Sequence, residues 1–405
     1  MKNRYAVTGW LLGFILLGSP VFGQNYEQIA KQIVNTSASI KPGDLVMITG
    51  GQHTMPLMEA IAVEVARVGG QPNMLVSTDK VARAVNIEMP ESAIQADKSD
   101  SWLLQSDVLI TLPQVEDNRA VMAGLTPERD AKFAKVAAEA GLTEKLDASK
   151  LRGVFVSYPS KSFAANQQLD FSGYEQMIWA GIGADYTAIA TQAQQMKQRL
   201  AAGRKVHITS PAGTDLTFQL VGRPVFADDG MVSATDQQEK LIYNRTARLP
   251  GGLVYGTCDE TSATGKLAAS PTTLLGKPLR GFKADLKNGQ LANARAEVGA
   301  EDFQKWMIAP YSATDMRVGY FSIGLNPAMK PQEQKGYNPS TAAGMVFLNI
   351  GNNELHGGQN KVAAGYSFPI ANATVEVDGN VIIRNGQLVS PEVAKAVPAR
   401  KKSSK

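Results

Sequence analysis

Cysteine and histidine are scarce in this chain of 405 residues, and their scarcity limits the chemistry available to it. The single cysteine, Cys258, has no partner for an intramolecular disulfide bond. The three histidines are His53, His207 and His356, and none has the HExxH spacing of a metal motif. Motifs of the CxxC and EF-hand type are missing too. Each histidine is therefore expected to be structural or solvent-exposed rather than a metal ligand.

Long apolar runs are also missing, and a segment that spans a bilayer needs about 20 apolar residues. The run WLLGFILLG at residues 10–18 is too short, but Lys2 and Arg4 precede it and small residues follow it up to Gly23. These features predict a secretory signal peptide over residues 1–23, cleaved after Gly23. No cysteine follows the apolar run, so no lipid anchor is expected. We expect an exported protein, periplasmic or extracellular, without a stable membrane span.

The body of the chain has no excess of positive over negative charge, although the formal net charge of the whole sequence is +4. Two cations belong to the signal peptide and five to residues 395–405, and subtracting these seven leaves −3. A nucleic-acid-binding protein needs a basic body or a basic stripe, and the sequence has neither, so no nucleic-acid partner is expected. Residues 391–405 are predicted to form a disordered basic tail.

The first half of the chain alternates between helical and strand-like patterns. Apolar residues at helical spacing predict helices, and apolar runs between them predict buried strands. The predicted helices cover residues 25–40, 55–71, 126–146 and 185–205, and the predicted strands cover residues 45–49, 72–78, 106–113 and 152–160. Thr126 followed by Pro127 is typical of a helix start. This order predicts a doubly wound α/β domain with a parallel sheet over residues 25–205.

The second half has the pattern of mainly β-structure. Alternating apolar residues predict a hairpin over residues 206–224 and further strands within 276–296, 344–351 and 373–389. The pairs Asp378-Gly379 and Asn385-Gly386 are typical of hairpin turns. One helix is predicted near residues 299–310. Residues 206–390 are therefore expected to form a mainly β (α+β) C-terminal domain.

Motifs of nucleophilic and phosphate-binding enzymes are missing as well. The sequence has no GxSxG elbow, and Cys258 has no histidine near it in the sequence. The segment GGQHTMP at residues 50–56 follows a strand but lacks GxGxxG and the Walker lysine, so it is interpreted as a turn before a helix. Asp215 and Arg223 interrupt the alternation of the first hairpin, and taken alone they are interpreted as a turn cap and a surface residue.

Several short segments, taken in order, resemble the aminopeptidase T family of thermophilic metallo-aminopeptidases, which is leucyl aminopeptidase-like. These segments are KPGDLVMITG, SDVLITLP, VFVSYPS, GTDLTFQLVGRP, LPGGLVYGTCDE and VGYFSIGLNP, within residues 27–390. The resemblance implies an α/β domain followed by a β-rich domain that carries the active site, and it implies a homodimer. It also implies removal of N-terminal residues from peptides by two divalent metals held by Glu, Glu, His, His and Asp. Such metals lower the pKa of a bound water and polarise the scissile carbonyl.

The ligand positions that the resemblance assigns are occupied by other residues. The first family Glu follows LPGG, where this chain has Leu253, and the second precedes a GxNP segment, where it has Tyr320. A family His falls on Phe347 in GMVFLNIGNN. The last His and Asp belong within residues 363–379, which contain no histidine, and Asp378 fits a hairpin turn better than a ligand.

Two functions of different class follow. The first is a family member without the metal, in which an aromatic-walled pocket binds a peptide or another small ligand, or in which the protein is a scaffold. Its candidate pocket residues are Asp215, Arg223, Asp259, Glu260, Tyr320, Phe347 and His356. The second is an active aminopeptidase whose divalent metal, such as Zn, Co or Mn, is held at a relocated site by Asp259, Glu260 and His356, with Asp215 as a further candidate.

Overall fold

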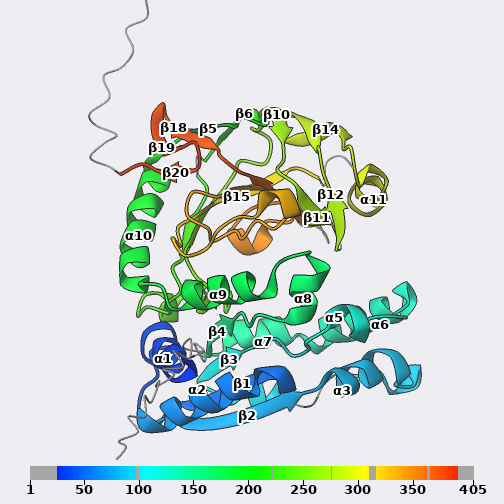
Figure 1. The fold of residues 1–405 in the computed structure, drawn as a ribbon, viewed down its shortest axis with the longest axis vertical. Coiled ribbons are helices and arrows are strands. Elements are labelled where there is room, and N and C mark those ends of the chain that lie inside the picture. The colour runs from blue at the N-terminus through cyan, green and yellow to red at the C-terminus, as the bar shows by residue number, and fades with distance from the viewer. Residues whose placement is uncertain are drawn as a thin grey trace, which may run out of the picture.

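The chain folds into a parallel sheet with helices and, beyond it, two antiparallel sheets that face each other (Figure 1). The structure is a computed structural model and describes residues 25–96, 98, 100–220, 222–274, 276–309, 316–362 and 365–390. The predicted signal peptide at 1–23 and the predicted tail at 391–405 lie outside the described residues. No helix within the described residues is long and apolar enough to cross a membrane.

The parallel sheet has the strand order β2-β1-β3-β4-β8. Its strands are β1 Leu45–Gly51, β2 Gln71–Ser77, β3 Val108–Thr111, β4 Arg152–Val156 and β8 Thr246–Leu249. Val46 and Ile48 on β1 are fully buried, because apolar runs in parallel strands are covered by the crossover helices. This confirms the predicted α/β fold and gives it a doubly wound strand order of the flavodoxin type.

Helices surround this sheet and continue towards the antiparallel part. They are α1 Tyr26–Lys31, α2 Met55–Arg67, α3 Asp79–Arg83, α4 Asp100–Leu104, α5 Asn118–Val121, α6 Pro127–Ala140, α7 Leu142–Ala148, α8 Lys161–Asn166, α9 Phe171–Ile182, α10 Tyr186–Ala202 and α11 Ala300–Phe303. Short 3-10 or π-helical segments follow several of them, such as Gln32–Ser37 after α1. In Figure 1, α8 and α9 lie between the parallel sheet and the antiparallel sheets, while α10 runs along one side of the latter.

The antiparallel part contains an outer sheet with the order β14-β13-β10-β6-β5-β18-β19-β20 and an inner sheet with the order β17-β16-β15-β9-β7. The outer strands are β5 Lys205–Thr209, β6 Asp215–Gln219, β10 Thr264–Ala268, β13 Lys283–Lys287, β14 Gln290–Arg295, β18 Thr374–Val377, β19 Asn380–Arg384 and β20 Gln387–Leu388. The inner strands are β7 Val225–Asp228, β9 Leu253–Thr257, β15 Val318–Gly324, β16 Val346–Gly351 and β17 Gly365–Ile370. A small ribbon of β11 Thr272–Leu274 and β12 Lys277–Leu279 lies apart from them.

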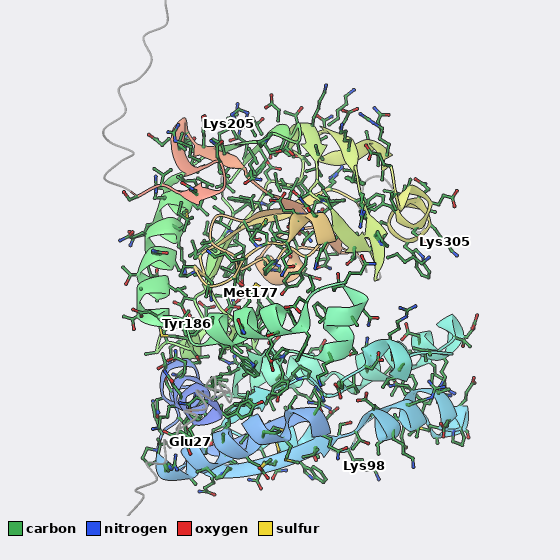
Figure 2. All side chains as sticks on the ribbon, in the orientation of Figure 1. Glu27, Lys98, Met177, Tyr186, Lys205 and Lys305 are labelled. Atoms are coloured by element: carbon green, nitrogen blue, oxygen red, sulfur yellow. The ribbon has the colours of Figure 1, made fainter. Side chains whose placement is uncertain are left out.

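The two antiparallel sheets share an apolar core. Phe218 of the outer sheet and Phe321 of the inner sheet are almost fully buried, and their ring centroids lie 5.1 Å apart. Figure 2 shows side chains filling the space between the layers, with Met177 of α9 labelled below the inner sheet. Its sulfur accepts a hydrogen bond of 3.3 Å from the backbone N–H of Lys330. One face of the inner sheet, which carries Phe321, packs on the outer sheet, and the other face is turned towards α9 and the α/β part.

The predicted turns are confirmed by the backbone. Asp378 and Gly379 both have positive φ, at 49° and 81°, and so do Asn385 and Gly386, at 47° and 76°. These left-handed conformations are those of the two-residue hairpin turns that Asp-Gly and Asn-Gly favour. Asp378 accepts hydrogen bonds from the backbone N–H groups of Arg204 and Lys205, so its carboxylate holds the turn.

Several predicted boundaries need correction. The helix predicted at 126–146 is two helices, α6 and α7, because Gly141 between them adopts φ 59°. The helix near 299–310 is short, since α11 ends at Phe303 and continues as a π-helical segment to Ile308. The division at residue 205 does not separate the sheets, because β8 lies beyond it and pairs with β4 in the parallel sheet.

Candidate functional site

The three positions that the resemblance assigned to metal ligands lie on one face of the inner sheet. Leu253 pairs with Gly324, Phe347 pairs with Ser322, and Tyr320 pairs with Thr257. Successive residues of a strand point to opposite faces, so Tyr320, Ser322 and Gly324 share a face, and so do their partners. That face is opposite to the face carrying the buried Phe321.

These positions are spread along the strands rather than gathered at one point. Leu253 is paired with Gly324, four residues along β15 from Tyr320. At about 3.3 Å per residue this separates them by roughly 13 Å. Tyr320 also lies in the stretch Val318 to Phe321, where the register of β15 against β16 shifts.

An aromatic cluster surrounds Tyr320. The ring of His356 stacks on Tyr320 with a centroid distance of 4.2 Å, and it meets the edge of Tyr255 at 4.8 Å. The imidazole Nε2 of His356 lies 3.3 Å from the hydroxyl of Tyr243. His356 thus reaches inward from the loop after β16 and is buried, with 9% exposure. Thr257 donates a hydrogen bond to the backbone carbonyl of His356 and so helps to hold the loop.

The cluster keeps its titratable groups neutral. Burial, and then the positive charge of Arg248, lower the pKa of His356 to about 4. Burial raises the pKa of Tyr320 and of Tyr255 above the usual value of a phenol. Because a neutral imidazole carries one N–H, His356 has one donor and one acceptor for its partners. Its Nδ1 is buried and has no hydrogen-bond partner within the described residues.

Next to this cluster, Asp228 and Arg248 form an ion pair between the inner sheet and the parallel sheet. Nη1 of Arg248 lies 3.2 Å from Oδ2 of Asp228, and the backbone N–H of Arg248 donates to Oδ1 at 3.2 Å. The guanidinium carbon lies 4.1 Å from the ring centroid of Tyr243. Burial is the largest single influence on the pKa of Arg248 and would lower it, but the charge and hydrogen bond of Asp228 together with the neighbouring Tyr243 and Tyr255 raise the pKa overall.

A cavity of about 600 Å³ opens beside this ion pair. It lies outside the carboxyl ends of β3, β4 and β8, which is where ligands bind to open α/β sheets. Apolar side chains form most of its wall, and the polar lining includes Gln114, Ser157, Asp228, Arg248, Ser340 and Thr341. Leu253 contributes to the same wall, so one of the positions that the resemblance assigns to a metal ligand faces this cavity.

Glu260 and Arg223 are brought together, but as a structural ion pair. Glu260 is buried with 4% exposure, and its Oε2 lies in a short contact with Arg223. Its Oε1 accepts hydrogen bonds from Asn353 Nδ2 at 2.9 Å and from the backbone N–H of Gln359 at 2.7 Å. Oε1 therefore helps to fix the loop that carries His356, while Oε2 is taken up by Arg223.

Asp215 and Asp259 lie apart from the aromatic cluster. Asp215 begins β6 on the solvent side of the outer sheet, where its Oδ1 lies 2.8 Å from Nε2 of His207 and 74% of its side chain is exposed. Alternation along β6 buries Leu216 and turns Asp215 outward. Asp259 accepts hydrogen bonds from the backbone N–H and hydroxyl of Thr261, as a turn residue does, and these bonds lower its pKa.

The residues at the positions that the resemblance assigns to metal ligands do not fit a divalent metal. Leucine and phenylalanine carry no donor atoms, while the metals of catalytic sites need carboxylate or imidazole ligands. Within the part of the chain that the structure describes, no three His, Cys, Asp or Glu side chains are grouped as a metal site. The relocated set of Asp259, Glu260 and His356 falls within that part and is not such a group.

Sequence reasoning missed four residues of this region: Asp228, Tyr243, Arg248 and Tyr255. Tyr255 could have been found, because it stands two residues after Leu253 and alternation puts it on the same face. Arg248 could have been found only with β8 assigned, since Arg248 precedes the LPGG turn at the carboxyl end of that strand. Nothing in the sequence around Asp228 indicates that it pairs with a residue of the parallel sheet.

Comparisons with protein families and with solved structures relate the chain to known proteins. The model of the thermophilic metalloprotease family M29 matches residues 22–328. The fold is similar to that of wild-type AmpT from Thermus thermophilus, with a TM-score of 0.71 and 18% identity over 90% of this chain and 99% of that chain. It is also similar to 2,5-dihydroxypyridine dioxygenase from Pseudomonas putida KT2440, with a TM-score of 0.57 and 15% identity over 91% of this chain and 98% of that chain. No curated protein matches the sequence.

Proposed function

The chain belongs to the thermophilic metalloprotease family M29, and from this premise we propose that it is an exported member that binds a peptide or small molecule instead of hydrolysing it. The observation that carries the proposal is the chemistry of one sheet face: Leu253, Tyr320 and Phe347 stand where the resemblance assigns metal ligands. Tyr320 is stacked on His356 there, at 4.2 Å between ring centroids.

The family name implies a bound metal and a peptidase reaction. The side chains of Leu253, Tyr320 and Phe347 support neither. Metal-assisted hydrolysis needs a Lewis acid that activates water and polarises the carbonyl. Two of the three replacing side chains are hydrocarbons, and the third is a phenol whose pKa is raised by burial. These three side chains can therefore neither hold such a metal nor activate a water for hydrolysis.

A binding role is supported by the cavity at the carboxyl ends of the parallel strands. At about 600 Å³ it is within the size range of small-molecule sites, and its wall is mainly apolar with a few polar groups. The wall combines residues of the parallel sheet with Leu253 of the inner sheet and Tyr337 and Ser340 of a connecting loop. A peptide with apolar side chains suits such a wall.

The fold alone does not decide between binding and catalysis. One solved structure with a similar fold is, by its title, a 2,5-dihydroxypyridine dioxygenase, whose chemistry is not peptide hydrolysis. Because one fold can support different reactions, the activity has to be inferred from the residues at the site.

The first experiment measures metal content and hydrolysis on the same purified mature chain. The protein is incubated with Zn²⁺, Co²⁺ or Mn²⁺, the bound metal is quantified by mass spectrometry, and aminoacyl-anilide hydrolysis is assayed beside an active member of the family. We expect no stoichiometric metal and no turnover. Stoichiometric metal with turnover, both lost in Glu260→Ala or His356→Ala, would establish a relocated metal site and refute the proposal.

The second experiment tests the cavity itself. Leu253→Trp places an indole in the cavity wall, and Val63→Trp, at a position of α2 that is 50% exposed, is the matched control. Calorimetric titration with leucine-containing tripeptides is expected to show binding to the wild type and to Val63→Trp, and at least a tenfold weaker affinity in Leu253→Trp. Equal affinities in all three would place the binding site elsewhere.

Export and assembly belong to the same proposal. Expression of the full chain is expected to give a mature protein that begins after Gly23, as intact-mass spectrometry of the exported fraction would show. Light scattering after size exclusion is expected to give a homodimer, the assembly that the family resemblance implies.

A further inference from the structure

We infer that Arg248 is the residue that binds a carboxylate group of the ligand. The inference rests on the proposed function and adds the chemical class of the ligand. It comes from three features of Arg248: its unused donors, its position between two cavities, and the fixed orientation of its guanidinium plane.

The guanidinium uses only one of its nitrogens within the described residues. Nη1 donates to Oδ2 of Asp228 and to the backbone carbonyl of Thr246, both at 3.2 Å. Nε and Nη2 have no hydrogen-bond partner among the described residues, although only 34% of the side chain is exposed. A half-buried guanidinium with unused N–H donors is costly unless water or a ligand accepts from them.

The unused donors lie where a ligand can reach them. Arg248 lines both the cavity of about 600 Å³ and a smaller, mainly apolar cavity of about 200 Å³. The two cavities share Thr111, Phe155 and Arg248. These residues form one row across the parallel sheet, because Thr111 pairs with Phe155 and Phe155 pairs with Arg248. Arg248 is therefore at the junction of the two spaces.

Two contacts fix the plane of the guanidinium. The ring of Tyr243 lies under it, 4.1 Å from the guanidinium carbon, and Asp228 holds Nη1 from one side. The remaining edge, Nε–H and Nη2–H, is the pair of parallel donors that binds a carboxylate through both oxygens. A pre-oriented fork loses little conformational entropy when it binds.

A singly charged carboxylate suits this site better than a phosphate. Arg248 is the single cation in the lining of the larger cavity within the described residues, and Asp228 already shares its charge. A dianionic phosphate would meet too little positive charge there, whereas a carboxylate needs one guanidinium edge. The apolar wall beside Arg248 suits the side chains of a peptide, whose C-terminal carboxylate is the natural group for this fork.

The test compares two probes that differ in charge at one end. The mature full chain is titrated calorimetrically with N-acetyl-Leu-Gly-Leu as the free acid and as its C-terminal amide. Acetylation removes the amine charge from both probes. We expect the acid to bind roughly 10- to 100-fold more tightly than the amide, which is the effect of a charge-assisted hydrogen-bonded pair.

Variants then assign the effect to Arg248. Arg248→Lys keeps a cation beside Asp228 but loses the fork, and it is expected to reduce the preference for the acid to less than about threefold. The control is Arg384→Lys on the exposed end of β19, which is expected to leave the preference unchanged. If Arg248→Lys is misfolded by circular dichroism, the double variant Arg248→Gln with Asp228→Asn removes both charges together and is expected to lose the same preference.

The outcomes separate this inference from the proposed function. Equal binding of acid and amide, or an acid preference that survives both Arg248 variants, would overturn the inference and leave the binding function intact. Tighter binding of inorganic phosphate than of the acid would overturn the choice of carboxylate. No binding of either tripeptide would overturn the binding function, and this inference with it.

Discussion

At the scale of single residues, the buried His356 is held by contacts with aromatic rings. Its imidazole stacks on the ring of Tyr320 and meets the edge of Tyr255, and the positive charge of Arg248 acts on it. A proton on this ring would be buried and repelled by that charge. The neutral imidazole therefore contributes packing to the cluster, and its protonation opposes folding.

We predict from this that His356 makes the protein less stable in acid. The folded pKa is lowered from 6.5 to about 4, so between these pH values the unfolded chain binds a proton that the folded chain does not. The free energy of unfolding is therefore unaffected by this group above pH 6.5, and it falls by about 3 kcal/mol as the pH decreases from 6.5 to 4.

The measurement is urea denaturation at about pH 7.5 and at pH 4, on the wild type and on His356→Phe. The variant keeps an aromatic ring in the stack and is expected to lose about 3 kcal/mol less on acidification than the wild type. His207→Gln, which changes a half-exposed histidine, is the control. The same acid sensitivity in His356→Phe would show that other groups cause it.

A second prediction at this scale concerns Glu260. Glu260→Gln removes the charge that pairs with the largely buried Arg223, so the free energy of unfolding is expected to fall by about 3 kcal/mol in urea denaturation. Adding Arg223→Met removes the stranded cation and is expected to restore part of the loss. Asp259→Asn, at a partly exposed turn residue next to Glu260, is the control and is expected to change stability by less than about 1 kcal/mol. If Glu260 were instead a metal ligand, Glu260→Gln would abolish metal uptake and leave the stability of the metal-free protein nearly unchanged.

The sequence predicted part of this site. The positions Leu253, Tyr320 and Phe347 were assigned from the order of short segments, and the strand register of the structure puts all three on one face. The partners of Glu260 could not be predicted, because Asn353 and Gln359 reach it only through the folding of the loop after β16. Asp215 was predicted as a pocket residue because the sequence does not show which face of the outer sheet is buried, and it is this that turns Asp215 outward.

At the scale of elements, the turn between β8 and β9 joins three parts of the fold. Asn326, which follows β15, is fully buried, and its side-chain amide donates to the carbonyls of Gly181 at 3.0 Å and Gly251 at 2.9 Å. Gly181 lies in α9 and Gly251 in the LPGG turn. The amide therefore fixes the turn that leads from Arg248 to Leu253.

We predict that Asn326→Ala destabilises the protein by about 3 kcal/mol, because two buried carbonyls lose their donor and a small cavity remains. Thermal and urea unfolding would measure this. Asn380→Ala, at the exposed first residue of β19, is the control and is expected to change stability by less than about 0.5 kcal/mol. A loss of similar size in both variants would show that the effect does not come from the buried amide.

Elements that carry local signals were predicted, and elements that depend on distant pairing were not. The turn between β18 and β19 could be predicted because an Asp-Gly pair favours the left-handed backbone conformation that Asp378 and Gly379 adopt. The strand β8, with the sequence TARL, is short and shows no periodicity of its own. It becomes a strand because Gly153 to Val156 of β4 offers it an edge, which lies about 90 residues earlier in the chain.

At the scale of the whole molecule, the chain passes between its two halves more than once. After β4 it forms α8 to α10 and the hairpin β5–β6, and then returns to the parallel sheet as β8 before it forms β9 (Figure 1). Arg245, just before β8, is buried and donates to the carbonyls of Leu146 and Leu151 near α7. The α/β part is thus completed by residues from the second half of the chain.

The last prediction follows from this interleaving. A fragment of residues 25–205 lacks β8 and Arg245, so the edge of β4 and the fully buried Val154 would lose their cover, and the carbonyl of Leu146 in α7 would lose its hydrogen-bond donor. We expect the fragment to unfold without a cooperative transition or to aggregate, and residues 25–390 to unfold in one cooperative step. Near-ultraviolet circular dichroism during thermal unfolding distinguishes the two. A fragment that keeps a native near-ultraviolet spectrum and a sharp transition would show that the parallel sheet folds by itself, and the division at residue 205 would then be a true domain boundary despite the exchange of β8.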